Sequence, residues 1–418
     1  MLEKQMTWKD KLGRLVNDAP LLAWLTGALV AVVLEHLVGD PLATVLGLPK
    51  IPVLFGAVIM LKTPVLIPSI VAYVTAIYLL PVSMTARLLR APGNRLAAWL
   101  LQYHIAVAAV VHLVLLYLVL HIWSDISAYR VLTLKLTMIA VILTLSLNVI
   151  NGYMGEFSCS HPGFMALGAY GASVFTLVLF ANDKVFGKAL LPAELGPFLF
   201  PVGLIFGGLV AAFGALIIAI PSFRTRGDYL AIISLAFMFI VKSLIENLEF
   251  VGGPRGLSSH PNLSSLPVVF VWMALCIWII NNFVRSTIGK ALNAIRDDEA
   301  AADAMTVNTR KTKMVAFMFA AFWAGVAGGL FAHVLRYVNP ATFGIQKLAE
   351  VLAMVYFGGL NSVYGSIVGA VSLSLLGEAL RPLEIFKWII IPLLLILVMI
   401  YRPTGLIAFK EFDVRAVM

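Results

Sequence analysis

Charge is scarce in this chain of 418 residues. Lysine, arginine, aspartate and glutamate make up 12% of it, whereas ordinary soluble domains contain about 25% of these residues. Hydrophobic residues make up 61% of the chain, and they fall in long runs rather than in the alternating segments of about ten residues typical of a membrane β-barrel. A chain with so few charges cannot cover a water-facing surface, so the composition excludes an ordinary soluble protein.

The chain also lacks the residue patterns of several kinds of chemistry. Its two cysteines, Cys159 and Cys276, provide neither a disulfide framework nor a metal-binding spacing. There is no Walker A motif, G-x-x-x-x-G-K-[ST], and neither H-E-x-x-H nor G-x-S-x-G occurs. Basic and aromatic residues do not gather on one soluble segment, as nucleic-acid binding requires. We therefore expect a protein that is not an enzyme, with no cofactor of its own and no nucleic-acid partner.

Twelve apolar runs are candidates for membrane-spanning helices, because about 20 mostly apolar residues cross a bilayer. These runs are 20–38, 64–82, 99–121, 131–150, 163–181, 199–220, 229–248, 266–284, 312–334, 346–360, 363–380 and 386–401. Backbone polar groups in hydrocarbon must be paired within their own segment, so the runs must be helical. The run 346–360 is short and contains two charged residues, so a broken or re-entrant helix is its alternative. The sequence predicts an all-α polytopic membrane protein with ten to twelve transmembrane helices.

Basic residues between the runs indicate an orientation. The N-terminus, the segments 83–98, 221–228 and 285–313, and the C-terminus after residue 402 are the basic ones. The predicted spans place all five on the same side of the membrane. Since cytoplasmic loops carry an excess of lysine and arginine, we expect this side, with both termini, to be the cytoplasmic one.

The longest polar stretch within the apolar part of the chain is 285–313. It contains six basic residues, a cluster of four acids and apolar residues at a helical spacing. An amphipathic, alanine-rich helix between two membrane spans must lie at the membrane surface, where a water-soluble partner could bind it. An interfacial helix without such a partner is the alternative.

The segment 148–163 is polar and rich in glycine at the junction of two apolar runs. Polar backbone at membrane depth is tolerated where it lines a cavity or is buried in protein, and charged groups there are costly and often functional. Candidate residues of a translocation path are therefore Asn148, Asn151 and Ser158, together with Glu350 and Glu378. Ordinary loop structure is the alternative for this segment. Another intramembrane acid, Glu35, is expected at the membrane–water interface.

Three pairs of glycines lie four residues apart within predicted spans. Small residues at this spacing allow two helix backbones to approach closely. The pairs are Gly203/Gly207, Gly325/Gly329 and Gly365/Gly369. They predict tight helix contacts, and a gating hinge is the alternative.

Four segments, taken in order, resemble the permease subunits of branched-chain amino acid ABC transporters, and most of all the M-type subunit. The first reads NxxNGYxGxFS at 148–158, followed by HPGF at 161–164 and GAY at 168–170. The second reads RGDYLAI at 226–232 and GGPxGL at 252–257. The third reads GKAL at 289–292, AIRDDE at 294–299 and AM at 304–305, and the fourth reads NP at 339–340, LAMV at 352–355 and GGLNS at 358–362.

The resemblance covers residues 131–380 and suggests three parts. Residues 1–130 form an extra N-terminal membrane section of three helices, 131–402 the core permease domain, and 403–418 a cytoplasmic tail. The resemblance implies an ABC importer permease fold and a short cytoplasmic coupling helix within 285–313. In such permeases this helix docks on the ATP-hydrolysing subunit. The residues assigned to coupling are Arg296, Asp297, Asp298, Glu299, Ala300, Ala301 and Met305.

The resemblance also implies partners and a substrate class. It suggests a homologous second permease, two ATPase subunits that hydrolyse ATP, and a periplasmic or extracellular substrate-binding protein, all at a bacterial inner membrane. Branched-chain or other apolar amino acids are the expected substrates. Permeases for urea, short amides or other amino acids are alternatives, as is an ion-coupled secondary carrier. The chain departs from the family pattern at Thr306, where glycine is usual.

Overall fold

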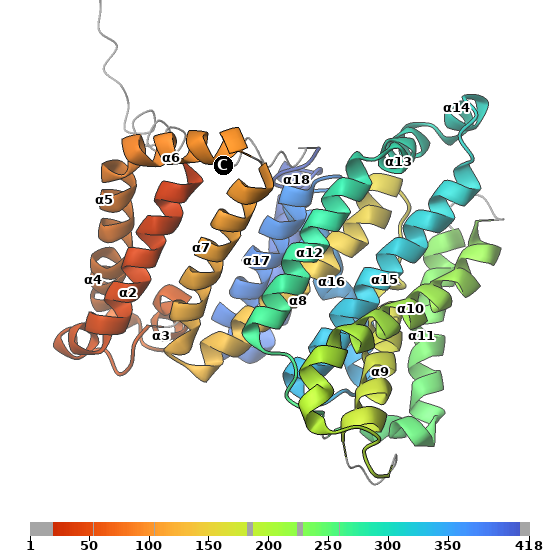
Figure 1. Ribbon diagram of the computed structural model, residues 1–418, viewed down its shortest axis with the longest axis horizontal. Helices are drawn as coiled ribbons and strands as arrows, with labels where there is room; N and C mark the ends of the chain where they lie inside the picture. Colours follow the sequence, from red (N-terminus) through yellow and green to blue (C-terminus); the bar gives the residue numbers. More distant parts are fainter. Residues whose placement is uncertain are drawn as a thin grey trace, which may run out of the picture. The chain divides into compact units, whose positions relative to one another are not determined.

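The structure is a computed structural model that describes residues 20–409, except for 53, 104, 182–186, 224–228 and 259. The regular elements among these residues are helices (Figure 1), and an isolated bridge joins the extended backbones of Leu257 and Val338. Nine helices in the described residues are long and apolar enough to cross a membrane. The shorter apolar helices Val363–Ala379 and Ile389–Tyr401 add to these. The prediction of an all-α polytopic membrane protein is therefore confirmed.

Two compact units divide the chain. In the described part, the smaller unit contains the residues up to Leu134 and the segment Glu378–Lys387. The larger unit contains Lys135–Gly377 and the described residues from Trp388 onward. The boundary falls within helix α8 (Ala128–Asn148).

The smaller unit is built from helices that follow one another in the chain. They are α2 (Leu21–Val45), α3 (Ala57–Lys62), α4 (Ile67–Val74), α5 (Leu80–Leu88), α6 (Arg90–Tyr103), α7 (Ile105–Asp125) and the first turns of α8. A π-helical stretch, Thr75–Leu79, joins α4 to α5, so that Pro64–Leu88 forms one long apolar helix. Helix α6 lies across the ends of its neighbours (Figure 1).

Helix α6 differs from the sequence prediction, which makes 83–98 a loop before a span over 99–121. That prediction is wrong, because these residues are helical in α5 and α6. Helix α6 exposes both of its arginines and buries one narrow face, so it is amphipathic and suited to a membrane surface. The buried face consists of Gly93, Ala97 and Leu100. The membrane span therefore begins only at α7.

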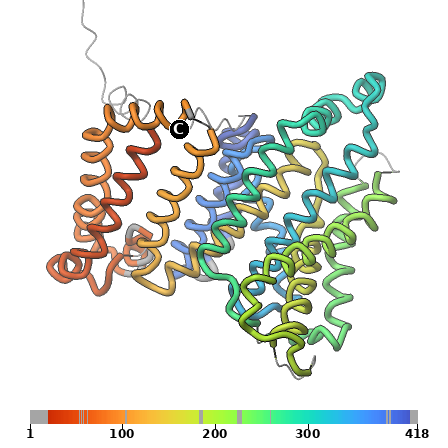
Figure 2. The backbone as a smooth tube through the Cα atoms, viewed as in Figure 1, coloured from red at the N-terminus to blue at the C-terminus, as the bar shows by residue number. Residues whose placement is uncertain are grey.

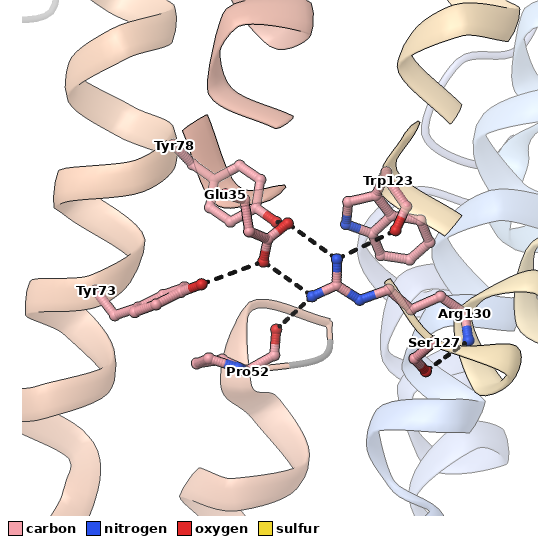
Figure 3. A network of polar contacts seen from close by, with 7 residues as sticks. All are labelled: Glu35, Pro52, Tyr73, Tyr78, Trp123, Ser127 and Arg130. Atoms are coloured by element: carbon pink, nitrogen blue, oxygen red, sulfur yellow. Dashed lines mark hydrogen bonds and ion pairs between the residues drawn. The ribbon is translucent and has the colours of Figure 1, made fainter. Parts of the chain in front are cut away.

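An ion pair lies at the centre of the smaller unit (Figure 3). Both guanidinium amino groups of Arg130 donate to the Glu35 carboxylate at 2.9 Å, and both side chains are fully buried. The hydroxyls of Tyr73 and Tyr78 also donate to this carboxylate, and the carbonyl oxygen of Pro52 accepts a hydrogen bond from Arg130. Glu35 is therefore paired inside the protein, and its expected place at the membrane–water interface stays a prediction. Removing either side chain of such a pair leaves the other charge buried and uncompensated, which typically lowers the free energy of unfolding by about 3–5 kcal/mol.

The larger unit begins with the rest of α8, which continues into a π-helix, η4 (Val149–Met154). Its remaining helices are α9 (His161–Phe180), α10 (Gly196–Ser222), α11 (Tyr229–Asn247), α12 (Leu266–Arg285), α13 (Thr287–Asp297), α14 (Glu299–Ala304), α15 (Thr309–Leu335), α16 (Ile345–Gly358), α17 (Val363–Ala379) and α18 (Lys387–Tyr401). Figure 2 shows α13 and α14 at one extremity of this unit, beyond the end of α12. The run predicted at 346–360 is the short helix α16.

Helices α9, α10 and α15 pack together through glycines. A Cβ atom placed on Gly168 of α9 would lie 2.2 Å from the backbone of Gly325 on α15. A Cβ on Gly207 of α10 would lie 2.5 Å from the carbonyl oxygen of Gly168. These backbones are in direct contact, so no larger residue fits between them. On α17, Gly365 and Gly369 meet the backbone of Gly358 in the same way, and the predicted tight helix contacts are confirmed.

The Gly168 contact can be tested by substitution. We expect Gly168→Ala to lower the melting temperature of the detergent-solubilised protein, because the added methyl group must push α9 and α15 apart, and such overpacking costs about 1–3 kcal/mol. The control is Gly171→Ala on the same helix, where the new Cβ meets its neighbours at 3.4 Å, an ordinary contact distance. Equal melting temperatures for the two variants would contradict the packing argument.

Candidate functional site

Helices α13 and α14 form two sides of a sharp corner within the polar stretch 285–313. Helix α13 begins after Ser286, whose hydroxyl accepts from the backbone N–H of Gly289. It ends at Asp298, whose backbone is extended and whose carboxylate accepts from the N–H groups of Ala300 and Ala301 at 2.9 and 3.0 Å. Asp298 therefore caps α14, which explains why the helix restarts at the next residue.

The surface of α14 carries three of the seven residues assigned to coupling. Glu299, Ala300 and Ala301 are exposed, whereas Ala302 is buried and anchors the helix. Met305 follows the helix with 76% of its surface exposed, although it is apolar. Small side chains beside an exposed methionine give a surface that another protein can approach closely, since methionine adapts readily to a partner.

Thr306 ends this helix in a left-handed conformation, with a φ of +66°. Its N–H donates to the carbonyl of Asp303, and the N–H of Val307 donates to the carbonyl of Ala302. This pair of bonds is the Schellman motif, in which glycine usually occupies the left-handed position. The departure from the family pattern at this position therefore leaves the turn intact, but it holds a β-branched residue in an unfavourable backbone conformation.

Lys313 of α15 joins α14 to the segment that precedes α9. Its ammonium donates to the Glu156 carboxylate at 2.6 Å and to the Glu299 carboxylate at 2.9 Å. The Lys313 side chain is only 8% exposed, whereas that of Glu299 is 53% exposed. Charge-assisted hydrogen bonds of this length are among the stronger ones in proteins. One buried cation therefore holds the first residue of α14 against the end of the α8–η4 helix.

Arg296 makes a second connection between the same two parts. Its side chain packs on Gly155, where an added Cβ would lie 2.4 Å from the Arg296 Cγ atom. Gly155 also has a φ of +76°, so both its conformation and this contact require glycine. The guanidinium donates to Asp297 at 2.8 Å and lies 5.3 Å from the centre of the Phe409 ring. The residue thus links α13, the end of η4 and the C-terminal segment.

The C-terminal segment runs back along the junction of α16 and α17. The N–H groups of Leu406 and Ile407 donate to the carbonyls of Phe357 and Gly358. These bonds bring Phe409 to Arg296. The sequence gives no local signal for this arrangement, because the partners are far apart in the chain.

The polar residues predicted in 148–163 are buried and hydrogen-bonded to protein. The Asn148 amide donates to the Ser362 carbonyl at 3.0 Å and to the Ser366 hydroxyl at 2.6 Å, and its oxygen accepts from the N–H of Asn361. Asn148 therefore holds the turn between α16 and α17. Its role in a translocation path stays a prediction.

Asn151 and Ser158 are joined within the same segment. The amide oxygen of Asn151 accepts from the N–H of Ser158 at 3.3 Å, and the Ser158 and Ser160 hydroxyls are 2.8 Å apart. Between them, the N–H of Cys159 donates to the Ser234 hydroxyl. Burial raises the pKa of the Cys159 thiol, so this cysteine is a packing residue and not a reactive one.

The two glutamates predicted for the path lie elsewhere. Glu350 pairs with Lys347 on α16 at 3.0 Å. Glu378 belongs to the smaller unit, where it accepts a hydrogen bond from the Tyr129 hydroxyl at 2.7 Å and lies 3.6 Å from Arg381. The role of these two glutamates in a translocation path stays a prediction. The motif RGD at 226–228 lies outside the described residues.

These features define a membrane permease component: spanning helices packed through glycines, and a polar helix pair projecting at one end. Comparison with known proteins agrees. Residues 129–400 match the family described as "Branched-chain amino acid transport system / permease component", and the chain belongs to this family. No solved structure matches the chain.

Several curated relatives have related names. The high-affinity branched-chain amino acid transport system permease protein LivM of Escherichia coli is 33% identical over 307 residues, which cover 65% of this chain and 68% of the relative. The high-affinity branched-chain amino acid transport system permease protein BraD of Pseudomonas aeruginosa is 29% identical over 153 residues, which cover 35% of this chain and 48% of the relative. The ribose import permease protein RbsC of Haemophilus influenzae is 25% identical over 222 residues, which cover 48% and 66%. The chain is thus a multi-pass membrane component of a transport system with other subunits.

The strain at Thr306 predicts an effect on stability. We expect Thr306→Gly to slow amide hydrogen exchange over 299–306, because it removes a left-handed conformation that costs about 1–2 kcal/mol for a residue with a side chain. The control is Thr309→Gly at the first position of α15, where glycine should speed exchange. Unchanged or faster exchange in Thr306→Gly would contradict the assignment of strain.

The Lys313 contacts predict that substitutions at Lys313 and Glu156 have non-additive effects on stability. We expect Lys313→Met to lower the melting temperature and to speed hydrogen exchange in α14, because it leaves the Glu156 and Glu299 carboxylates facing each other. Adding Glu156→Gln should restore part of the loss, with a coupling energy of about 0.5–3 kcal/mol. The control, Lys311→Met, removes the same charge at an exposed position of α15. Additive effects of the Lys313 and Glu156 substitutions would show that the two residues do not interact.

Proposed function

We propose that this chain is the M-type permease subunit of an ABC importer that moves branched-chain amino acids across a bacterial inner membrane. The family and the names of the relatives support this substrate class, and the spanning helices support the location. The importer comprises this chain, a homologous second permease, two ATPase subunits and a periplasmic or extracellular substrate-binding protein. ATP is hydrolysed by the ATPase subunits, and this chain binds no cofactor. Both termini lie in the cytoplasm, together with α13 and α14.

The observation that carries the proposal is the exposed surface of α14 and its attachment to the membrane helices. Ala300, Ala301 and Met305 face outward at the extremity of the larger unit (Figure 1). Charged residues at the edges of such a surface, Asp297 among them, set the register of a docked partner through complementary charge. In this arrangement α14 docks on an ATPase subunit.

The contacts behind α14 give the docked partner a route to the membrane helices. Lys313 holds Glu299 against Glu156, and Arg296 packs on Gly155. A displacement of α14 by an ATPase subunit is therefore transmitted to η4 and α8 through side chains in van der Waals or hydrogen-bond contact. The change between outward-open and inward-open states is driven by the different affinity of the ATPase subunits for the two states.

A docking test must avoid the internal contacts of α14. Glu299→Lys would place a second cation beside Lys313, so a loss of transport in that variant would have two explanations. Ala301→Trp adds bulk to the exposed surface only. We expect Ala301→Trp to reduce ATP-dependent leucine uptake at least tenfold in cells that express the complete importer, and to lose the ATPase subunits in a detergent pull-down.

The matched control for this test is Ala193→Trp, the same substitution at an exposed alanine next to the N-terminus of α10. It should transport leucine and retain the ATPase subunits. Normal uptake by Ala301→Trp would remove α14 from the docking role. Uptake by the lone chain in liposomes, without any ATPase, would instead indicate a secondary carrier, and uptake of urea or short amides in place of leucine would change the substrate class.

A further inference from the structure

Lys135 is a basic residue within a membrane-spanning helix that has no acidic partner among the described residues. It lies about two turns after the start of α8, the helix whose apolar window is 83% buried in protein. Its ammonium donates to the carbonyl oxygen of Ser264 at 2.8 Å. Three other basic residues within spanning helices, Arg130, Lys242 and Lys313, each pair with a carboxylate.

The position of Lys135 requires an explanation because a charged group within a span is costly unless it is compensated. The Ser264 carbonyl oxygen accepts one hydrogen bond from the Lys135 ammonium but supplies no opposite charge. An ammonium has three donor hydrogens, so Lys135 can still bind an anion while it contacts Ser264. The side chain is partly buried, so it is neither fully hydrated nor sealed in the core.

The residues around the Lys135 contact supply further donors. Ser264 is 1% exposed, and its hydroxyl is a buried group for which no hydrogen-bond partner exists among the described residues. Helix α12 begins two residues later, after Ser265, whose side chain does not cap it. The N-terminus of this long helix is positively polarised, and its first turn contains the N–H groups of Leu266 and Val268, whereas Pro267 between them has none. An ammonium, a free hydroxyl and a helix N-terminus thus lie together, and all three favour an anion.

We propose that Lys135, Ser264 and the N-terminus of α12 form a subsite for the carboxylate of the transported amino acid. The identity of the ligand rests on the proposed function, because every substrate of that class carries a carboxylate. The subsite belongs to the start of α12, and α13 follows the end of that helix, so it lies at the end of the larger unit away from the coupling helices (Figure 1). This is the end at which a substrate arrives before it crosses.

The test uses leucine and leucinol, which has an alcohol in place of the carboxylate. We expect leucine, but not leucinol, to raise the melting temperature of the full chain purified with its partner subunits in neutral phosphatidylcholine nanodiscs. Lys135→Met should abolish this shift, and Lys135→Arg should retain it. In proteoliposomes supplied with the binding protein and ATP, Lys135→Met should reduce leucine uptake at least tenfold, whereas Lys135→Arg should stay within threefold of the wild type.

A purely structural role for Lys135 gives a different pattern. In that case Lys135→Met would lower the melting temperature without leucine, but leucine would still raise it by the wild-type amount, and the proposal would be wrong. The proposal would also be wrong if the effect of Lys135→Met appeared only in nanodiscs that contain anionic phosphatidylglycerol and did not depend on leucine, because the ligand would then be a lipid phosphate.

The two proposals fail separately. A wild-type complex that shows the leucine shift but no ATP-dependent uptake would overturn the importer function and support the subsite. A Lys135→Met complex that takes up leucine as fast as the wild-type complex, and whose melting temperature leucine raises by the same amount, would support the importer and overturn the subsite.

Discussion

An unpaired polar group inside a membrane protein is costly, because hydrocarbon offers no water to hydrate it. The larger unit depends on this constraint more than on any single apolar contact. Asn148 satisfies four groups of the α16–α17 junction, and Lys313 donates to two carboxylates that come from different parts of the chain. The smaller unit obeys the same constraint through Glu35 and Arg130. Each pairing fixes segments that glycine-mediated packing alone would leave free to slide.

The sequence predicts best those features that depend on neighbouring residues. Most spans, the close glycine contacts and the polar stretch 285–313 follow from local composition and spacing, and the structure has them. Thr306 is a further example, since the family usually has glycine at this position and its φ of +66° gives the physical reason. Helix α6 was missed because its arginines suggest a loop, whereas their position on one exposed face is compatible with a helix at the membrane surface.

Contacts between distant segments are the features that the sequence does not reveal. Lys313 and Glu156 are 157 residues apart, and Arg130 and Glu35 are 95 apart. Nothing in the local pattern pairs one lysine of the basic stretch 285–313 with a particular acid, because six basic residues are present there and any of them could be a surface charge. Asn148 was singled out correctly as a polar residue at membrane depth, but sequence alone did not distinguish a side chain that faces a path from one that binds a neighbouring turn.

Helix α8 connects the two ends of the larger unit, and its two polar ends differ in character. Near its start, Lys135 contacts a single carbonyl and keeps unused donors, whereas at its far end Asn148 and the π-helical η4 are held by many protein contacts. Single-turn π-helical distortions often mark functional sites in helices, and this one adjoins Gly155, on which Arg296 packs. Under the proposed function, a shift of α14 would reach α8 at this end through Arg296 and Gly155, and the helix would carry that shift to Lys135. Under the proposed function, the same helix would bind the substrate carboxylate at one end and respond to the ATPase subunits at the other, so neither event requires a separate mechanical connection.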